Sequence, residues 1–185
     1  QGERWNDEAN RETETYLQET FQKLQKLGYN VGELGQIKEF GDALSSRYSA
    51  NLPPFKGIPY DSQLFKESIY GFQWWNLYNV VGLEYERSLK VFPLYSRLTK
   101  WFAAKANGTN PLKLVLLGGH ESSMFPFLSL YNITNYTCYT ENYKSQKAGQ
   151  PIPHPDCKFP EVASQFIYEF YNNSGNPYVK MLYNG

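Results

Sequence analysis

Apolar positions recur at helical spacing over the first hundred residues, which predicts a helical region. A second helix is expected around residues 34–44, a third from an N-cap at Asp61 to near Gly82, and a fourth around residues 94–102. The proline-rich residues 51–59 predict a loop. The first helix should end at Gly28, and its apolar positions lie three and four residues apart: Leu17, Phe21, Leu24 and Leu27.

The pattern changes after Pro111. Residues 113–119, Lys-Leu-Val-Leu-Leu-Gly-Gly, are a nearly continuous apolar run, typical of a strand buried on both faces. Ser122 or Ser123 should cap the following helix, residues 132–160 predict a loop excursion, and strands at 164–171 and 178–183 predict a hairpin. We therefore expect an α/β protein, with a helical lobe over residues 1–107 and part of an α/β core over residues 108–185.

Composition limits the partners. The chain has 18 basic and 18 acidic side chains, so its formal net charge is zero. A surface for nucleic acid would need a clustered basic excess, and we expect none. The longest apolar stretch, Leu112–Leu117, is too short to cross a bilayer. No signal peptide is visible and the chain begins at Gln1, so we expect a processed chain, a fragment or the ordered part of a longer protein.

Sequons and cysteines predict the compartment. Two cysteines, Cys138 and Cys157, flank a polar segment and could close a disulfide loop worth about 3 kcal/mol. The alternative joins them to His154 as a zinc site, but that spacing matches no recognised pattern. We favour the disulfide and a secretory, lysosomal or extracellular location. Four Asn-x-Ser/Thr sequons predict glycosylation in segments expected to be loops or turns: Asn107, Asn132, Asn135 and Asn172.

The candidate chemistry lies at His120 and Glu121, between the predicted strand and the next helix. Ligands of open α/β sheets bind beyond the carboxyl ends of strands, and a helix N-terminus offers free N–H groups to a phosphate. Gly118 and Gly119 would allow a sharp turn and a close approach of ligand to backbone. A histidine here could donate to a phosphate oxygen, and the adjacent acid could protonate a leaving alkoxide. The alternative is a solvent-facing histidine beside a carboxylate that merely stabilises the helix N-terminus.

Three segments resemble the histidine acid phosphatases. Gly118-Gly-His-Glu-Ser-Ser-Met-Phe-Pro-Phe-Leu128 resembles the family's His-Asp segment, in which that pair ends a strand and an amphipathic helix follows. Residues 159–171 and 178–184 look like its late strand and the last strand of its hairpin, and residues 61–101 look like its helical lobe. The resemblance therefore implies the histidine-acid-phosphatase-like, or phosphoglycerate-mutase-like, α/β core with a helical lobe.

The resemblance implies phosphomonoester hydrolysis through a phosphohistidine, without a metal or another cofactor. His120 would be the second histidine, which binds the phosphate, and Glu121 the proton donor. Two departures stand out: the family more often has Asp at the position of Glu121, and its nucleophile motif, Arg-His-Gly-x-Arg-x-Pro, does not occur here. Because that motif precedes the helical lobe in the family, the nucleophile would lie upstream of Gln1. We interpret His154 as a loop residue and assign no arginine to the phosphate.

We therefore predict the carboxyl-terminal half of a secreted or lysosomal phosphatase that needs the amino-terminal half of the same protein and is inactive alone. The alternative is a catalytically inactive glycoprotein that uses the fold for assembly, including homo-oligomers, since aromatic residues, here 17% of the chain, suit interaction surfaces. A third interpretation is an unrelated helical binding protein in which Gly-Gly-His120-Glu121 is accidental.

Overall fold

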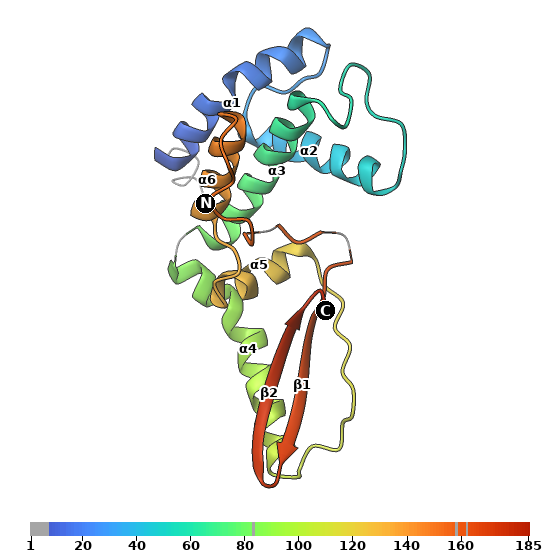
Figure 1. Ribbon diagram of the computed structural model, residues 1–185, viewed down its shortest axis with the longest axis vertical. Helices are drawn as coiled ribbons and strands as arrows, with labels where there is room; N and C mark the ends of the chain where they lie inside the picture. Colours follow the sequence, from blue (N-terminus) through green and yellow to red (C-terminus); the bar gives the residue numbers. More distant parts are fainter. Residues whose placement is uncertain (1–7, 83, 158, 162) are drawn as a thin grey trace. The chain divides into compact units, whose positions relative to one another are not determined.

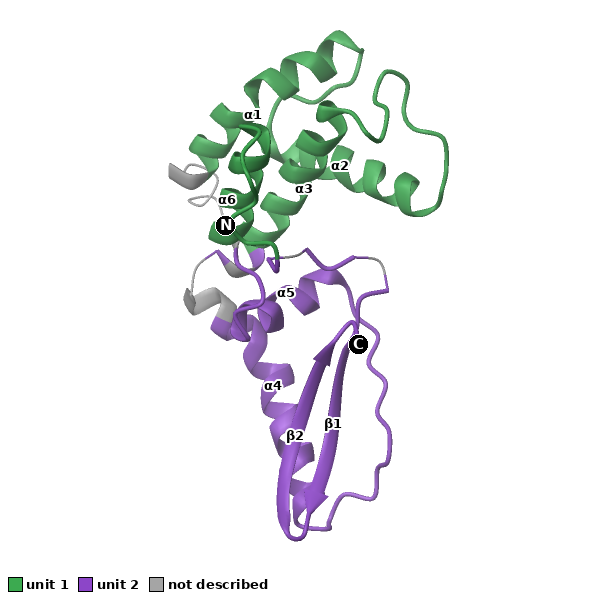
Figure 2. Cartoon of the chain, viewed as in Figure 1, with its two compact units in different colours: residues 1–79, 136–155 green, residues 80–135, 156–185 purple. Residues whose placement is uncertain are grey.

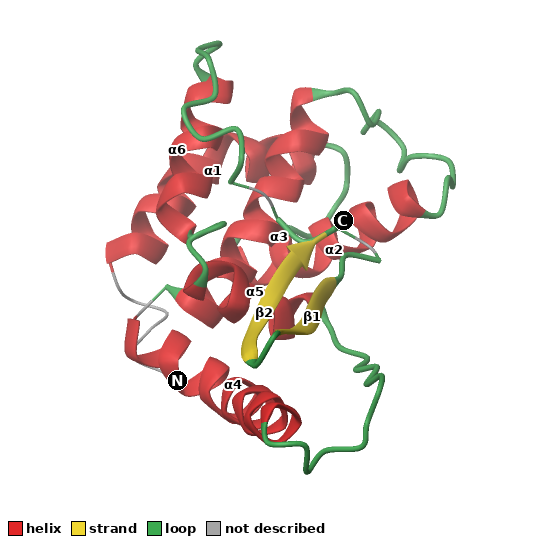
Figure 3. Ribbon diagram, turned by 60° about the horizontal axis from the view of Figure 1, so that its bottom comes forward, coloured by secondary structure: helices red, strands yellow, loops and turns green. Residues whose placement is uncertain are grey.

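A computed structural model describes residues 8–82, 84–157, 159–161 and 163–185. Over these residues the protein is a mixed α/β structure, mostly helical, with six helices and one two-stranded sheet (Figures 1 and 3). No helix within these ranges is long and apolar enough to cross a membrane. The elements in chain order are α1 Glu8–Lys26, α2 Leu34–Ser49, α3 Gln63–Val81, α4 Glu84–Ala106, α5 Glu121–Leu130, α6 Tyr136–Lys147, β1 Phe166–Asn173 and β2 Asn176–Tyr183.

The four predicted helices of the first hundred residues are confirmed as α1 to α4. The apolar spacing that predicted α1 and α2 marks their buried faces, on which Leu17 and Leu44 are fully buried. Leu27, which was expected to continue the buried face of α1, instead follows the end of the helix and is 45% exposed. The predicted cap of α3 is wrong by one residue. Ser62, not Asp61, precedes the helix directly, and its Oγ accepts a hydrogen bond from the N–H of Phe65 at 3.1 Å.

The chain divides into two compact units (Figure 2). Unit 1 comprises residues 1–79 and 136–155, and unit 2 comprises residues 80–135 and 156–185. This division differs from the sequence boundary expected between residues 107 and 108. Unit 1 contains α6, and unit 2 contains α4 together with the hairpin.

The prediction of a long loop over residues 132–160 is wrong, because residues 136–147 form α6 in unit 1. Two tyrosines one helical turn apart hold α6 against α3. The ring of Tyr143 stacks on Tyr70 with centroids 3.5 Å apart, and the ring of Tyr139 lies 5.6 Å from that of Tyr70. Tyrosine carries apolar area together with a polar tip, so this pair does not stand out in a polar stretch as leucines would. The turn residues and sequons around residues 136–147 therefore led to the prediction of a loop where the structure has α6.

A buried carboxylate also connects the helices of unit 1. Glu67 on α3 has a side chain that is 2% exposed. It accepts hydrogen bonds from Thr20 on α1 and from Nε2 of Gln63 at 3.0 Å, and Nζ of Lys147 on α6 lies 3.7 Å away. Charges are rarely buried without such partners, so these contacts are what make the position of Glu67 tolerable.

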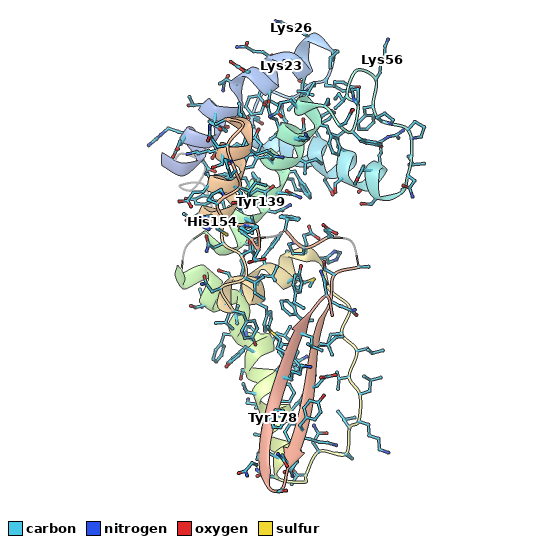
Figure 4. The ribbon with its side chains drawn as sticks, in the orientation of Figure 1. Lys23, Lys26, Lys56, Tyr139, His154 and Tyr178 are labelled. Carbon is cyan, nitrogen blue, oxygen red and sulfur yellow. The ribbon has the colours of Figure 1, made fainter. Side chains whose placement is uncertain are left out.

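In unit 2 the predicted hairpin is confirmed, with a first strand shifted by two residues, a longer second strand and a tighter turn than expected. The register pairs Phe166 with Tyr183 and Tyr171 with Tyr178. Tyr178 is labelled on β2 in Figure 4. Only Ser174 and Gly175 connect the strands, with φ of +52° and +87°. Positive φ at both central residues suits the right-handed twist of a hairpin, so the turn needs two residues rather than six.

The predicted strand over residues 112–118 is wrong for this chain. The segment between α4 and α5 is not part of a sheet, and it runs along the hairpin on the side away from α4 (Figures 1 and 3). A strand that is apolar on both faces needs paired neighbours, and the only other strands in the described ranges pair with each other. The segment therefore exposes large apolar side chains, with these exposed fractions: Leu112 50%, Leu114 73%, Val115 42%, Leu116 83% and Leu117 54%.

Candidate functional site

His120 and Glu121 lie together where α5 begins. His120 is the N-cap residue, with extended backbone at φ −103° and ψ 168°, and its exposed side chain makes no capping hydrogen bond. Its carbonyl accepts a hydrogen bond from the N–H of Ser123 at 2.9 Å. Glu121 is half-buried in the first turn, where a carboxylate favours the positive end of the helix dipole. The prediction that Ser122 or Ser123 caps this helix is wrong, because the helix begins one residue before Ser122.

The buried side of α5 fixes the position of this end. Phe125 and Leu128 are fully buried. The ring of Phe125 meets Phe159 edge-on with centroids 4.6 Å apart, and the ring of Phe127 lies 6.1 Å from that of Phe166 on β1. Such aromatic contacts add to the stabilisation from buried area. The apolar side of α5 therefore packs inside unit 2 while its first residues stay accessible to a ligand.

The glycines before His120 do not have the backbone conformation that would require glycine. Neither Gly118 nor Gly119 has a positive φ. A Cβ at Gly118 would meet no atom within 4 Å, and one at Gly119 would meet only Ser123, at 3.4 Å. An alanine would therefore fit at Gly118, and the close approach of a ligand there stays a prediction.

His154 belongs to a separate arrangement in unit 1. Its Nε2 lies 2.5 Å from Oε2 of Glu141 on α6. Nδ2 of Asn142 donates to the carbonyl of His154 at 2.6 Å, and Oδ1 of Asn142 accepts from its N–H at 2.8 Å. These contacts fix the loop after α6, in agreement with the interpretation of His154 as a loop residue (Figure 4). Glu141 and Asn142 were not predicted to contact His154, because α6 itself was not predicted.

A shallow polar depression of about 220 Å³ lies at the base of the hairpin, lined by Glu161, Ala163, Ser164, Gln165 and Asn184. Ala163 contributes to it with a φ of +66°, and Oγ of Ser164 accepts a hydrogen bond from the N–H of Glu161 at 2.9 Å. Neither His120 nor Glu121 lines this depression. The candidate site therefore lies at a helix end, where His120 is exposed and Glu121 is half-buried.

The predicted disulfide is confirmed: Cys138 and Cys157 are bonded to each other. Their sulfurs are consequently unavailable as thiolate ligands, which removes the zinc alternative that included His154. Oγ1 of Thr134, a residue that the sequence analysis did not single out, lies 3.1 Å from Sγ of Cys157. Since a disulfide sulfur carries no hydrogen, the threonine hydroxyl is the donor.

The four predicted sequons differ in accessibility. The asparagines at 107, 132 and 172 are exposed, and Asn135 is half-buried. The hydroxyl-bearing residues of the sequons at 107, 135 and 172 are all exposed. Thr134, which completes the sequon of Asn132, is only 1% exposed.

Comparison with known proteins adds no family to this picture. No family model matches the chain, and no curated protein is significantly similar to it.

Proposed function

We propose that this chain is the carboxyl-terminal half of a phosphomonoester hydrolase that works through a phosphohistidine, with His120 and Glu121 as its contribution to the site. The observation that carries the proposal is the placement of an exposed histidine and an adjacent carboxylate at the N-terminal end of α5. Free N–H groups and the helix dipole favour a phosphate at such an end. The segmental resemblance to histidine acid phosphatases supports the same chemistry.

In the proposed reaction the two side chains act on different oxygens. His120 donates a hydrogen bond to a non-bridging oxygen of the phosphate and stabilises the charge that develops there. Glu121, in its protonated form, delivers a proton to the bridging oxygen as the alkoxide leaves. The nucleophilic histidine and the arginines that hold the phosphate come from sequence outside residues 1–185. The reaction uses no metal, and the protein acts in a secretory or lysosomal compartment.

The segment of residues 113–119, which lies before His120, supports the proposal that further polypeptide is needed. Between Lys113 and Gly119 no backbone group forms a hydrogen bond to any residue of the described ranges. Extended backbone with apolar side chains on both faces is stabilised by neighbouring strands. The same neighbours would complete the core beneath the site, so residues 1–185 alone are expected to have no phosphatase activity.

The test uses the complete protein and two substrates near pH 5: an aryl phosphate with a good leaving group and an alkyl phosphate. His120→Ala should lower kcat/KM for both by about 10²-fold or more. Glu121→Gln should lower it by about 10²-fold for the alkyl phosphate and much less for the aryl phosphate, whose leaving group needs no proton. His154→Ala is the matched control and should leave both rates unchanged. Unchanged turnover in His120→Ala and Glu121→Gln would refute the site.

A second candidate is a catalytically inactive glycoprotein that assembles through this fold. The large exposed apolar side chains at residues 112–117 favour it, because such patches mark protein interfaces. The sequence encoded before Gln1 separates the candidates. An Arg-His-Gly-x-Arg-x-Pro motif there supports the hydrolase, and a complete precursor without it supports the assembly protein.

A further inference from the structure

The sequons at Asn107 and Asn132 lie in comparable positions, because each asparagine follows shortly after a helix that ends at Ala106 or Leu130. The N–H of Asn107 donates to the carbonyl of Ala103 at the end of α4, and the N–H of Asn132 donates to that of Ser129 at the end of α5. Both asparagine side chains are exposed. In folded unit 2 both amide nitrogens are therefore accessible to a glycan.

The two sequons differ in the hydroxyl that completes them. Thr109 is exposed, whereas Thr134 is 1% exposed and donates its hydroxyl to Sγ of Cys157 at 3.1 Å. The backbone holds Thr134 as well, since its N–H donates to the carbonyl of Leu128 at 3.3 Å. N-glycosylation requires a Ser or Thr two residues after the asparagine. A transferase that must contact this hydroxyl is therefore excluded from Asn132 once Thr134 is buried.

We infer that Asn132 is a modification site open only before unit 2 folds, and that closure of the Cys138–Cys157 bond competes with its glycosylation. In the reaction, Nδ2 of the asparagine bonds to C1 of a lipid-diphosphate-linked oligosaccharide, the C1–O bond to the diphosphate breaks, and Nδ2 loses a proton. The exposed side chain of Asn132 leaves room for the finished glycan. Glycosylation can consequently precede folding but cannot follow it. This inference rests on the secretory location and not on the phosphatase chemistry.

The test measures occupancy at each sequon after expression of the chain behind a secretion signal in eukaryotic cells. Thr137→Ala removes the neighbouring sequon of Asn135 by changing an exposed residue, and all variants carry it. In this background Asn107 and Asn172 should be nearly fully occupied, with Asn132 at about half their level or less. Cys138→Ala, which breaks the bond but retains Cys157, should raise occupancy at Asn132 about twofold. Occupancy at Asn107 should not change.

A reductant distinguishes competition from general misfolding. Brief addition of dithiothreitol during synthesis should raise occupancy at Asn132 in the chain that can form the bond, and should have no further effect in Cys138→Ala. Three outcomes would overturn the inference. These are equal occupancy of Asn132 and Asn107 while the bond can form, no response of Asn132 to either treatment, and no glycan at any sequon.

Discussion

Tyr143 illustrates how a single buried hydroxyl links packing to pH in unit 1. Its ring is 5% exposed and stacked on Tyr70, and within the described residues its hydroxyl has no hydrogen-bond partner. Burial raises the pKa of this hydroxyl, and the nearby carboxylate of Glu67 acts in the same direction. The unfolded side chain loses its proton near pH 10, while the folded one keeps it. The contribution of protonated Tyr143 to the free energy of unfolding is therefore complete below pH 10 and is lost as the pH rises further.

We predict opposite results for two conservative substitutions. Tyr143→Phe removes a hydroxyl that has no partner, so the free energy of unfolding at pH 7 should stay the same or rise by about 1 kcal/mol. Tyr70→Phe removes a hydroxyl that forms a hydrogen bond with the side chain of Thr140. This substitution should lower the free energy of unfolding at pH 7 by about 1 kcal/mol. Urea denaturation at pH 7 and at pH 10.5 measures both effects. Tyr143→Phe should also lose less stability between these pH values than the unaltered chain. A Tyr143→Phe chain that is less stable than Tyr70→Phe would contradict the assignment.

At the scale of elements, the hairpin depends on its two-residue turn. Gly175 has a φ of +87°, where a side chain is strained. Gly175→Ala should therefore lower the free energy of unfolding of unit 2 by about 1 kcal/mol. Gly118→Ala is the matched control: no atom lies within 4 Å of the added Cβ and its φ is not positive, so the change should be within about 0.5 kcal/mol. Thermal unfolding followed by circular dichroism compares the two, and equal losses would refute the role of the turn.

Helices α1 to α4 and the hairpin were predictable because local periodicity determines which side is buried. The helix α6 was not, since its packing depends on tyrosines and on Lys147 near Glu67, partners distant in sequence. The sequence predicted that a helix follows His120 and Glu121, but it placed the cap at Ser122 or Ser123 instead of His120. The surroundings of the pair were not predictable, because whether the preceding apolar segment is paired and buried depends on neighbours that periodicity cannot specify.

For the whole molecule, the exposed apolar side chains of residues 112–117 stand out, because neither unit buries them in its core. Both units bury a set of apolar side chains, yet Leu114 and Leu116 remain 73% and 83% exposed. The backbone N–H and C=O groups of residues 113–119 form no hydrogen bond within the described part of the chain. Many kinds of surface could cover the apolar side chains. The backbone groups on both sides of an extended chain, in contrast, obtain their hydrogen bonds from adjacent strands. The segment therefore combines exposed apolar side chains with backbone groups that form no hydrogen bond within the described ranges.

Hydrogen exchange tests this interpretation directly. In the chain of residues 1–185, the amides of Lys113 to Gly119 should exchange at nearly unprotected rates, because nothing in the described ranges accepts from them. The cross-strand bonded amides of β1 are the internal control and should be protected. In the complete protein of the proposed hydrolase, the same segment should gain about 10²-fold or more protection, since paired strands must open before their amides exchange. Protection already present at residues 113–119 in the shorter chain would mean that this chain pairs the strand itself. Lack of protection in the complete protein would instead favour a surface that is covered only by an assembly partner.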